Sequence, residues 1–147
     1  MHFAGTLEIP SPRERVWAFL TDPQAVGQCV PDVEGLEVTD PTHFRAVVRA
    51  GLGPVRGRFT FDVTWQELTA PEHARMTAQG KTAGSAVTVD SSMDLSETAD
   101  GGTALAWSAD VVVRGMIASV GARLLNGFAE KQTQQFFDCI RAQLSQN

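Results

Sequence analysis

The first residues of the chain alternate between apolar and polar side chains. Phe3, Leu7 and Ile9 share one side of this alternation, whereas Thr6 and Glu8 fall on the other. A period of two residues is typical of a β-strand with one buried face. The pattern therefore predicts an N-terminal strand.

Two helix starts follow this strand. Ser11 can cap a helix that begins at Pro12, and Glu14 completes a capping box. The pair Asp22-Pro23 repeats the combination of a capping residue with a proline, and Pro31 ends the segment. We expect two short helices directly after the first strand.

The alternation then returns in six segments separated by turn residues. The expected strands cover residues 36–39, 43–50, 58–68, 74–81, 86–96 and about 105–113. The clearest is 58–68, which has Phe59, Phe61, Val63 and Trp65 on one face. Asp100-Gly101-Gly102 predicts a tight hairpin before the last strand. These features predict consecutive antiparallel strands.

From Met116 onward the period changes to about 3.6 residues. One helical stripe collects the apolar residues Ile117, Val120, Leu124, Phe128, Phe136, Ile140 and Leu144. This pattern predicts a single helix of about 30 residues, about 45 Å long. A helix of that length can lie across a whole sheet.

The order of strand, two short helices, six strands and one long helix predicts an α+β fold. Consecutive strands twist and curl, and the long helix closes the open side. This arrangement resembles the helix-grip, or START/Bet v 1-like, architecture, with a curved antiparallel sheet of about seven strands. Residues 1–147 are expected to form one domain, because neither a linker nor a repeat divides them.

Composition and charge narrow the choice of partner and location. The net charge of -5 disfavours nucleic acid as a partner. A basic, apolar leader is missing at the start, and no apolar run reaches about 18 residues. We therefore expect a cytoplasmic protein, at most in peripheral contact with the inner face of the membrane. Cys29 and Cys139 are far apart in the sequence and form no CxxC motif, so we expect them to stay unbridged.

A series of short fragments along the chain narrows the resemblance. The fragments, in order, are Phe3-Ala4-Gly5, Pro12-Arg13, Val16-Trp17, Asp22-Pro23, Cys29-Val30-Pro31, Gly53-Pro54-Val55, Gly115-Met116-Ile117-Ala118, Gly121 and Gln135-Phe136-Phe137. The series resembles the carbon monoxide dehydrogenase G-subunit family. This resemblance implies an accessory role beside molybdenum hydroxylase subunits, linked to the membrane or its quinone pool. Longer members carry an apolar C-terminal extension that this sequence lacks, which argues against membrane anchoring.

Catalytic signals are weak. The sequence has three histidines, and none has another His, Cys or carboxylate at the spacing of a metal site. We therefore expect no metal site at His2, His43 or His73. Cys29 beside Val30 is read as a small buried hydrophobe rather than a nucleophile.

The glycine-rich segment 51–57 and two aspartates on the expected strands are interpreted as structural features. The glycine-rich segment 51–57 joins two strands instead of preceding a helix, which disfavours a phosphate loop. It is either a hairpin at a pocket mouth or a connector without a role. Asp62 and Asp110 are assigned outward, solvated or paired with Arg58 or Arg114.

A curved sheet gripped by one helix leaves space that side chains do not fill, and small residues such as Ala46 and Ala109 enlarge it. The favoured function is therefore non-catalytic binding of an apolar small molecule, without any other cofactor. The family resemblance implies that this molecule is lipid or quinone-like. The expected ligand-binding residues are Phe61, Val89, Met93, Trp107, Val111, Leu124, Leu125 and Phe128. Phe136 and Ile140 are expected to pack without touching the ligand.

Two alternatives remain open. A cyclase or hydrolase on the same fold would place two or more ionisable groups inside the cavity. An assembly or recruitment factor without a ligand would have a filled interior and an exposed apolar patch.

Overall fold

A computed structural model describes residues 1–52 and 55–145 of the chain. The strands are β1 (His2–Ile9), β2 (Val33–Asp40), β3 (His43–Leu52), β4 (Val55–Thr69), β5 (His73–Thr82), β6 (Ser85–Glu97) and β7 (Thr103–Gly115). The helices are α1 (Arg13–Leu20), α2 (Pro23–Val26), the 3-10 helices η1 (Gly27–Cys29) and η2 (Met116–Val120), and α3 (Ala122–Ser145). The predicted order of elements is confirmed, and all six later strands lie within a few residues of their expected positions.

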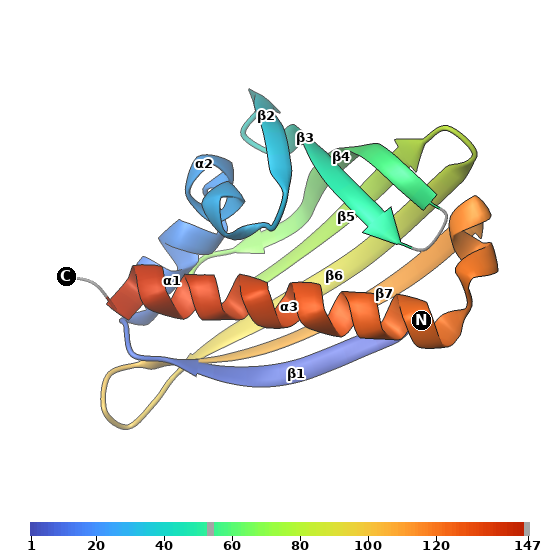
Figure 1. Cartoon of the computed structure of the whole chain (residues 1–147). Helices are drawn as coiled ribbons and strands as arrows, with labels where there is room; N and C mark the ends of the chain where they lie inside the picture. The colour runs from blue at the N-terminus through green and yellow to red at the C-terminus, as the bar shows by residue number, and fades with distance from the viewer. Residues whose placement is uncertain (53–54, 146–147) are drawn as a thin grey trace.

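All seven strands form one antiparallel sheet in the order β1-β7-β6-β5-β4-β3-β2. Consecutive hairpins account for every neighbour except β1, which pairs with β7. The strands β1 and β2 therefore form opposite edges of the sheet, and α1, α2 and η1 carry the chain from one edge to the other (Figure 1).

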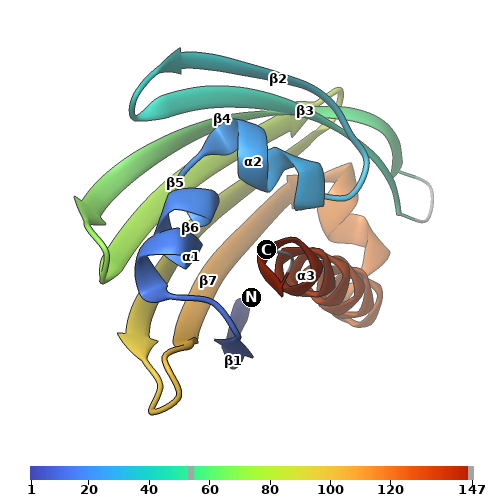
Figure 2. The same cartoon turned by 90° about the vertical axis from the view of Figure 1, so that its left-hand side faces the viewer.

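The sheet curls around α3, which lies in its concave side (Figure 2). Leu125, Ile140 and Leu144 are the buried side chains of this helix. Their burial explains why a mostly polar helix stays on the sheet, since packing of one apolar face contributes most of the stability of such a helix.

The prediction of one continuous helix from Met116 is wrong. The chain first forms η2, and Gly121 then adopts a left-handed φ of 92° before α3 begins. Glycine reaches this conformation without the steric cost of a Cβ atom. The break resets the helical phase, so α3 does not continue the stripe that begins at Ile117.

The buried apolar residues form two separate clusters. One includes Leu7, Ile9, Val16, Leu95, Leu105, Ile140 and Leu144, and joins the start of the sheet to α1 and the end of α3. The other consists of Leu52, Val55, Phe59, Ile117 and Leu125, and joins the β3–β4 hairpin to η2 and the start of α3. The two ends of the molecule are thus packed independently, which leaves the middle of the sheet available for a cavity.

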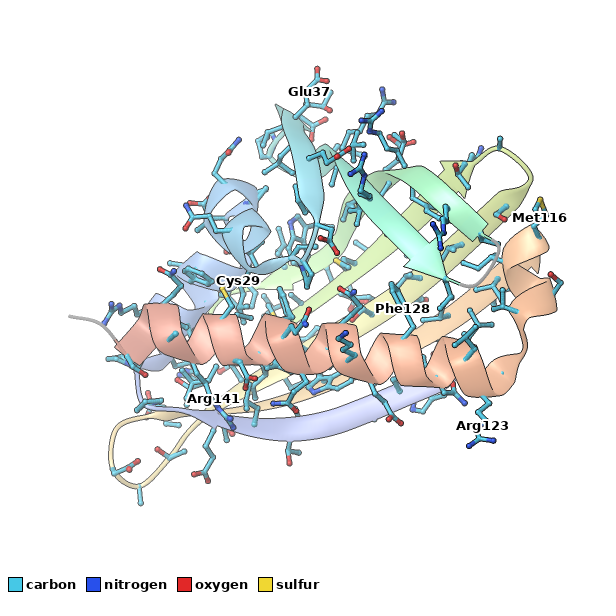
Figure 3. The ribbon with its side chains drawn as sticks, viewed as in Figure 1. Cys29, Glu37, Met116, Arg123, Phe128 and Arg141 are labelled. Carbon is cyan, nitrogen blue, oxygen red and sulfur yellow. A yellow bond between two sulfur atoms is a disulfide. The ribbon has the colours of Figure 1, made fainter. Side chains whose placement is uncertain are left out.

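A disulfide joins Cys29 to Cys139, with their Cα atoms 5.3 Å apart. The prediction that these cysteines are unbridged is therefore wrong. Sequence separation does not limit the distance in space, because the fold brings η1 against the C-terminal half of α3 (Figure 3). The bridge fixes the segment between β1 and β2 to the long helix.

The convex face of the sheet carries charged residues in cross-strand pairs. Asp62 and Asp110 point outward as predicted, and both are well exposed. Their partners differ from the predicted ones: Asp62 accepts a hydrogen bond from Arg45 at 2.9 Å, and Asp110 pairs with His2 at 2.7 Å. The observed register places these groups, and not Arg58 or Arg114, directly across from the two carboxylates.

The structure describes only part of the glycine-rich segment 51–57. The glycine-rich segment 51–57 does connect β3 to β4, but its residues 53–54, and with them the interpretation as a pocket mouth, lie outside the described residues. Within the described chain, none of the helices has the length and apolar character needed to cross a membrane.

Candidate ligand-binding cavity

A cavity of about 570 Å³ lies between the concave face of the sheet and α3. Small-molecule sites in proteins are typically about 300–1,000 Å³. The assembly-factor alternative required an interior filled by side chains. The cavity therefore argues against that alternative.

One wall of the cavity comes from the inward face of β4. Phe59, Phe61, Val63 and Trp65 all line it, as their alternation in the sequence predicts. Phe61 lies over Gly80 of β5, its register partner, and a Cβ atom at position 80 would overlap the ring. The glycine therefore sets how close Phe61 can lie to the sheet.

A second aromatic side chain, Trp107 of β7, has the same relationship to Gly5 of β1. The two residues are register partners, and a Cβ atom at position 5 would lie 3.0 Å from the indole Nε1. The indole also contacts the ring of Phe137 on α3, with the ring centres 5.5 Å apart. Trp107 thus spans from the sheet to the helix.

The helix contributes one continuous face to the wall. Its lining residues are Leu125, Phe128, Ala129, Gln132, Thr133, Phe136 and Phe137. Their spacing of three, four and seven residues is that of one helical face. Figure 3 shows Phe128 on the side of α3 toward the sheet, whereas Arg123 points away from it.

The structure brings together seven of the eight predicted site residues. Phe61, Val89, Met93, Trp107, Val111, Leu125 and Phe128 all line the cavity. Leu124 does not line it and is 46% exposed. The assignment of Leu124 to the pocket side of the helix is wrong: the lining face of α3 includes its neighbour Leu125, and adjacent positions lie about 100° apart around a helix.

Phe136 faces inward as expected, but it also lines the cavity, which extends farther along α3 than the sequence indicated. Ile140 is completely buried and lies in the core, as expected.

Sequence reasoning missed part of the wall. Val26 lines the cavity from α2, and Val30 and Pro31 line it from the turn between η1 and β2. No periodic signal marks these positions, because irregular segments have no repeating inward direction. Gln132 and Thr133 were also missed, although counting the 3.6-residue period from Leu125 would have found them.

Ionisable groups do not converge on the cavity among the described residues. Arg49 is the one ionisable side chain in the described wall, and it is 67% exposed and pairs with Glu34 at 3.6 Å. An acid-base enzyme on this fold would need at least two such groups facing its substrate.

The groups with shifted pKa values lie elsewhere in the described chain. On the convex face, the hydrogen bonds between Arg75 and Asp90 raise the pKa of the Arg75 guanidinium and lower the pKa of the Asp90 carboxyl. At the β2–β3 turn, a hydrogen bond with His43 and another from the Thr42 backbone lower the pKa of Asp40 to about 2. These shifts arise from surface ion pairs and turn hydrogen bonds, and none of these residues lines the cavity.

A metal centre has no candidate in the described part of the chain. No three His, Cys, Asp or Glu residues there are grouped so as to hold an ion. The contacts that the cavity wall offers are thus mainly apolar, with a few neutral polar side chains.

The model of one protein family matches almost the whole chain. This family is the G subunit of carbon monoxide dehydrogenase (CoxG), and the match covers residues 5–145. No curated protein is similar enough to match the sequence.

Several solved structures share the fold. A conserved protein from Geobacillus kaustophilus is 24% identical with a TM-score of 0.91, covering 99% of this chain and 95% of its own. A START superfamily protein from Mycobacterium smegmatis is 14% identical with a TM-score of 0.79, covering 99% and 97%. Ara h 8.0201 is 11% identical with a TM-score of 0.68, covering 100% and 99%. These similarities confirm the predicted START/Bet v 1-like, helix-grip fold.

Proposed function

Since the chain belongs to the carbon monoxide dehydrogenase CoxG family, whose members are accessory subunits, we propose that it binds an apolar lipid or quinone-like molecule without converting it. The observation that carries this proposal is the open cavity of about 570 Å³ with a mainly apolar wall. Burial of an apolar ligand there contributes roughly 25 cal/mol per Å² of covered surface.

The cavity can be tested by filling it. Ala109 lines the cavity from β7, and Ala106 lies exposed on the same strand with its side chain on the opposite face. The variant Ala109→Trp is expected to weaken binding of the apolar dye N-phenylnaphthylamine at least tenfold, because the indole occupies the ligand's space. Ala106→Trp is the matched control and should bind the dye like the unmodified protein.

The dye titration also addresses ligand class. A quinone should displace the dye competitively from the unmodified protein. A folded protein that shows no saturable dye binding would contradict the proposal, and so would an Ala109→Trp variant that binds normally.

The proposed partners are molybdenum hydroxylase subunits of a carbon monoxide dehydrogenase system. We propose that the protein acts in peripheral contact with the inner face of the membrane, where apolar ligands are dissolved. The Cys29–Cys139 disulfide is uncommon in a reducing cytoplasm, so the cysteines do not support the cytoplasmic location that was expected from the sequence. Affinity purification of the tagged chain from carbon monoxide-grown cells should enrich the hydroxylase subunits over cells with the tag alone. Equal recovery in both preparations would contradict the partnership.

A further inference from the structure

Most polar groups in the described cavity wall are already engaged or covered. The Ser91 hydroxyl donates to the Ser108 carbonyl at 3.1 Å, and the Ser92 hydroxyl pairs with that of Ser108 at 3.1 Å. The indole Nε1 of Trp65 is covered by protein atoms, although it has no hydrogen-bond partner among the described residues. These groups leave a bound molecule few polar contacts on the sheet side.

Two polar side chains of α3 differ from these. Gln132 and Thr133 line the cavity, are half-buried, and have no hydrogen bond among the described residues. A threonine in a helix often donates to the carbonyl four residues earlier, as Thr21 does to Trp17 at 2.8 Å. Thr133 makes no such bond in the described structure, so its hydroxyl and the Gln132 amide are free to bind a ligand.

The indole of Trp107 does not extend this polar pair. Its ring contacts Phe137 of α3, with the ring centres 5.5 Å apart. Its Nε1 is packed against Gly5 of β1, 3.0 Å from the position that a Cβ atom would take there. The polar side chains that remain for a ligand are therefore those of Gln132 and Thr133 on α3.

The chemistry of these two side chains defines a ligand class. The Thr133 hydroxyl and the Gln132 amide are neutral, and both can donate hydrogen bonds. They would leave an acceptor oxygen satisfied inside an otherwise apolar chamber. A buried carboxylate or phosphate would also need a cation, because burying an unpaired charge is costly. In the described wall Arg49 is the one cationic side chain, and it pairs with Glu34 at the surface.

We propose that Gln132 and Thr133 form a polar subsite that recognises a neutral ligand through a carbonyl oxygen. The inference rests on the proposed function and sharpens it. The subsite selects carbonyl-bearing molecules, such as a quinone head group, over hydrocarbons of the same shape and over carboxylates.

The test compares three probes of one shape: menadione, methylnaphthalene and naphthoic acid. Equilibrium dialysis at neutral pH, without reductant because menadione reacts with thiols, measures the affinity for each. The unmodified protein is expected to bind menadione about tenfold more tightly than methylnaphthalene, the gain from one or two hydrogen bonds. It should bind naphthoic acid most weakly of the three.

The double variant Gln132→Leu/Thr133→Val is expected to lose this preference while keeping its affinity for methylnaphthalene. Retained hydrocarbon binding shows that the variant is folded with its cavity intact. Gln134→Leu is the matched control, because Gln134 is exposed and bonds to Asp138 on the outer side of α3. This control should keep the full preference for menadione.

Two results overturn the subsite in different ways. If the unmodified protein binds menadione and methylnaphthalene equally, or if the double variant keeps the preference, the cavity proposal stands and the polar subsite is wrong. If neither probe binds a folded protein, the ligand-binding function itself is wrong and the subsite falls with it.

Discussion

The ring of Phe61 lies over Gly80 of the neighbouring strand, so closely that a Cβ atom on Gly80 would overlap three of its carbon atoms. Gly5 and Trp107 repeat this arrangement at the other side of the sheet. In both pairs the missing side chain lets an aromatic ring lie against the sheet. The space that remains above the rings belongs to the cavity.

Replacing Gly80 by alanine is expected to push Phe61 away from the sheet and into the cavity. We expect a loss of about 1–3 kcal/mol in the free energy of unfolding, typical of overpacking, together with weaker dye binding. Denaturant unfolding and dye titration measure the two effects. Gly127→Ala is the control, because a Cβ atom there meets nothing within 4 Å on the exposed side of α3. It should stabilise the helix by about 0.5–1 kcal/mol and leave binding unchanged.

The cavity predicts that two large residues of α3 respond differently to truncation. Ile140→Ala should cost about 2–5 kcal/mol of stability, because Ile140 is fully buried and its removal creates a new void. Phe128→Ala enlarges a space that already exists, so its stability cost should be clearly smaller while dye affinity falls. Leu124→Ala, at a 46% exposed position, should affect neither property. Equal stability losses for Phe128→Ala and Ile140→Ala would mean that Phe128 is ordinary core.

The disulfide predicts a large effect of losing one cysteine. Cys29 and Cys139 are 110 residues apart in the sequence, so their bridge restricts the unfolded chain strongly. Cys139→Ser is expected to lower the free energy of unfolding by about 2–5 kcal/mol. Reductant should destabilise the unmodified protein and have no effect on Cys139→Ser. Two titratable thiols in denatured protein that never met a reductant would contradict the bridge.

His73 predicts a pH-dependent contribution to stability. Its hydrogen bond with Asp94, at 2.7 Å, raises the pKa of the imidazole, and nearby Glu67 adds to the effect. Because the folded pKa lies above the unfolded one, this stabilisation is complete below the unfolded pKa and is lost as the pH rises through the folded pKa. The unmodified protein should therefore be more stable than His73→Gln at about pH 5.5 and should lose that advantage by about pH 9.

Unfolding free energies of both proteins across this pH range provide the measurement. Arg75 also contacts Glu67, at 3.6 Å, but its charge does not change in this range. Asp94→Asn is the control, because it removes the partner and should abolish most of the pH dependence. An advantage that grows toward high pH would contradict the assignment.

The long helix shows which features the apolar spacing predicts and which depend on tertiary packing. Apolar spacing correctly predicted that residues near the C-terminus form a helix and that Phe128, Ile140 and Leu144 face inward. It could not decide between the adjacent apolar residues Leu124 and Leu125, since the packing of α3 against the sheet sets the rotation of the helix. The pocket side therefore begins at Leu125 instead of Leu124.

Local patterns in the chain were enough to predict the order of the elements, the antiparallel hairpins and the inward face of the clearest strand. These features depend on periods of two or 3.6 residues and on turn residues, which act between near neighbours. The folded molecule was needed to establish that Cys29 meets Cys139, that Phe61 and Trp107 lie over glycines, and that Gln132 and Thr133 line the same cavity as Trp107. Such contacts join residues far apart in the chain, and their geometry follows from how the sheet curls around α3.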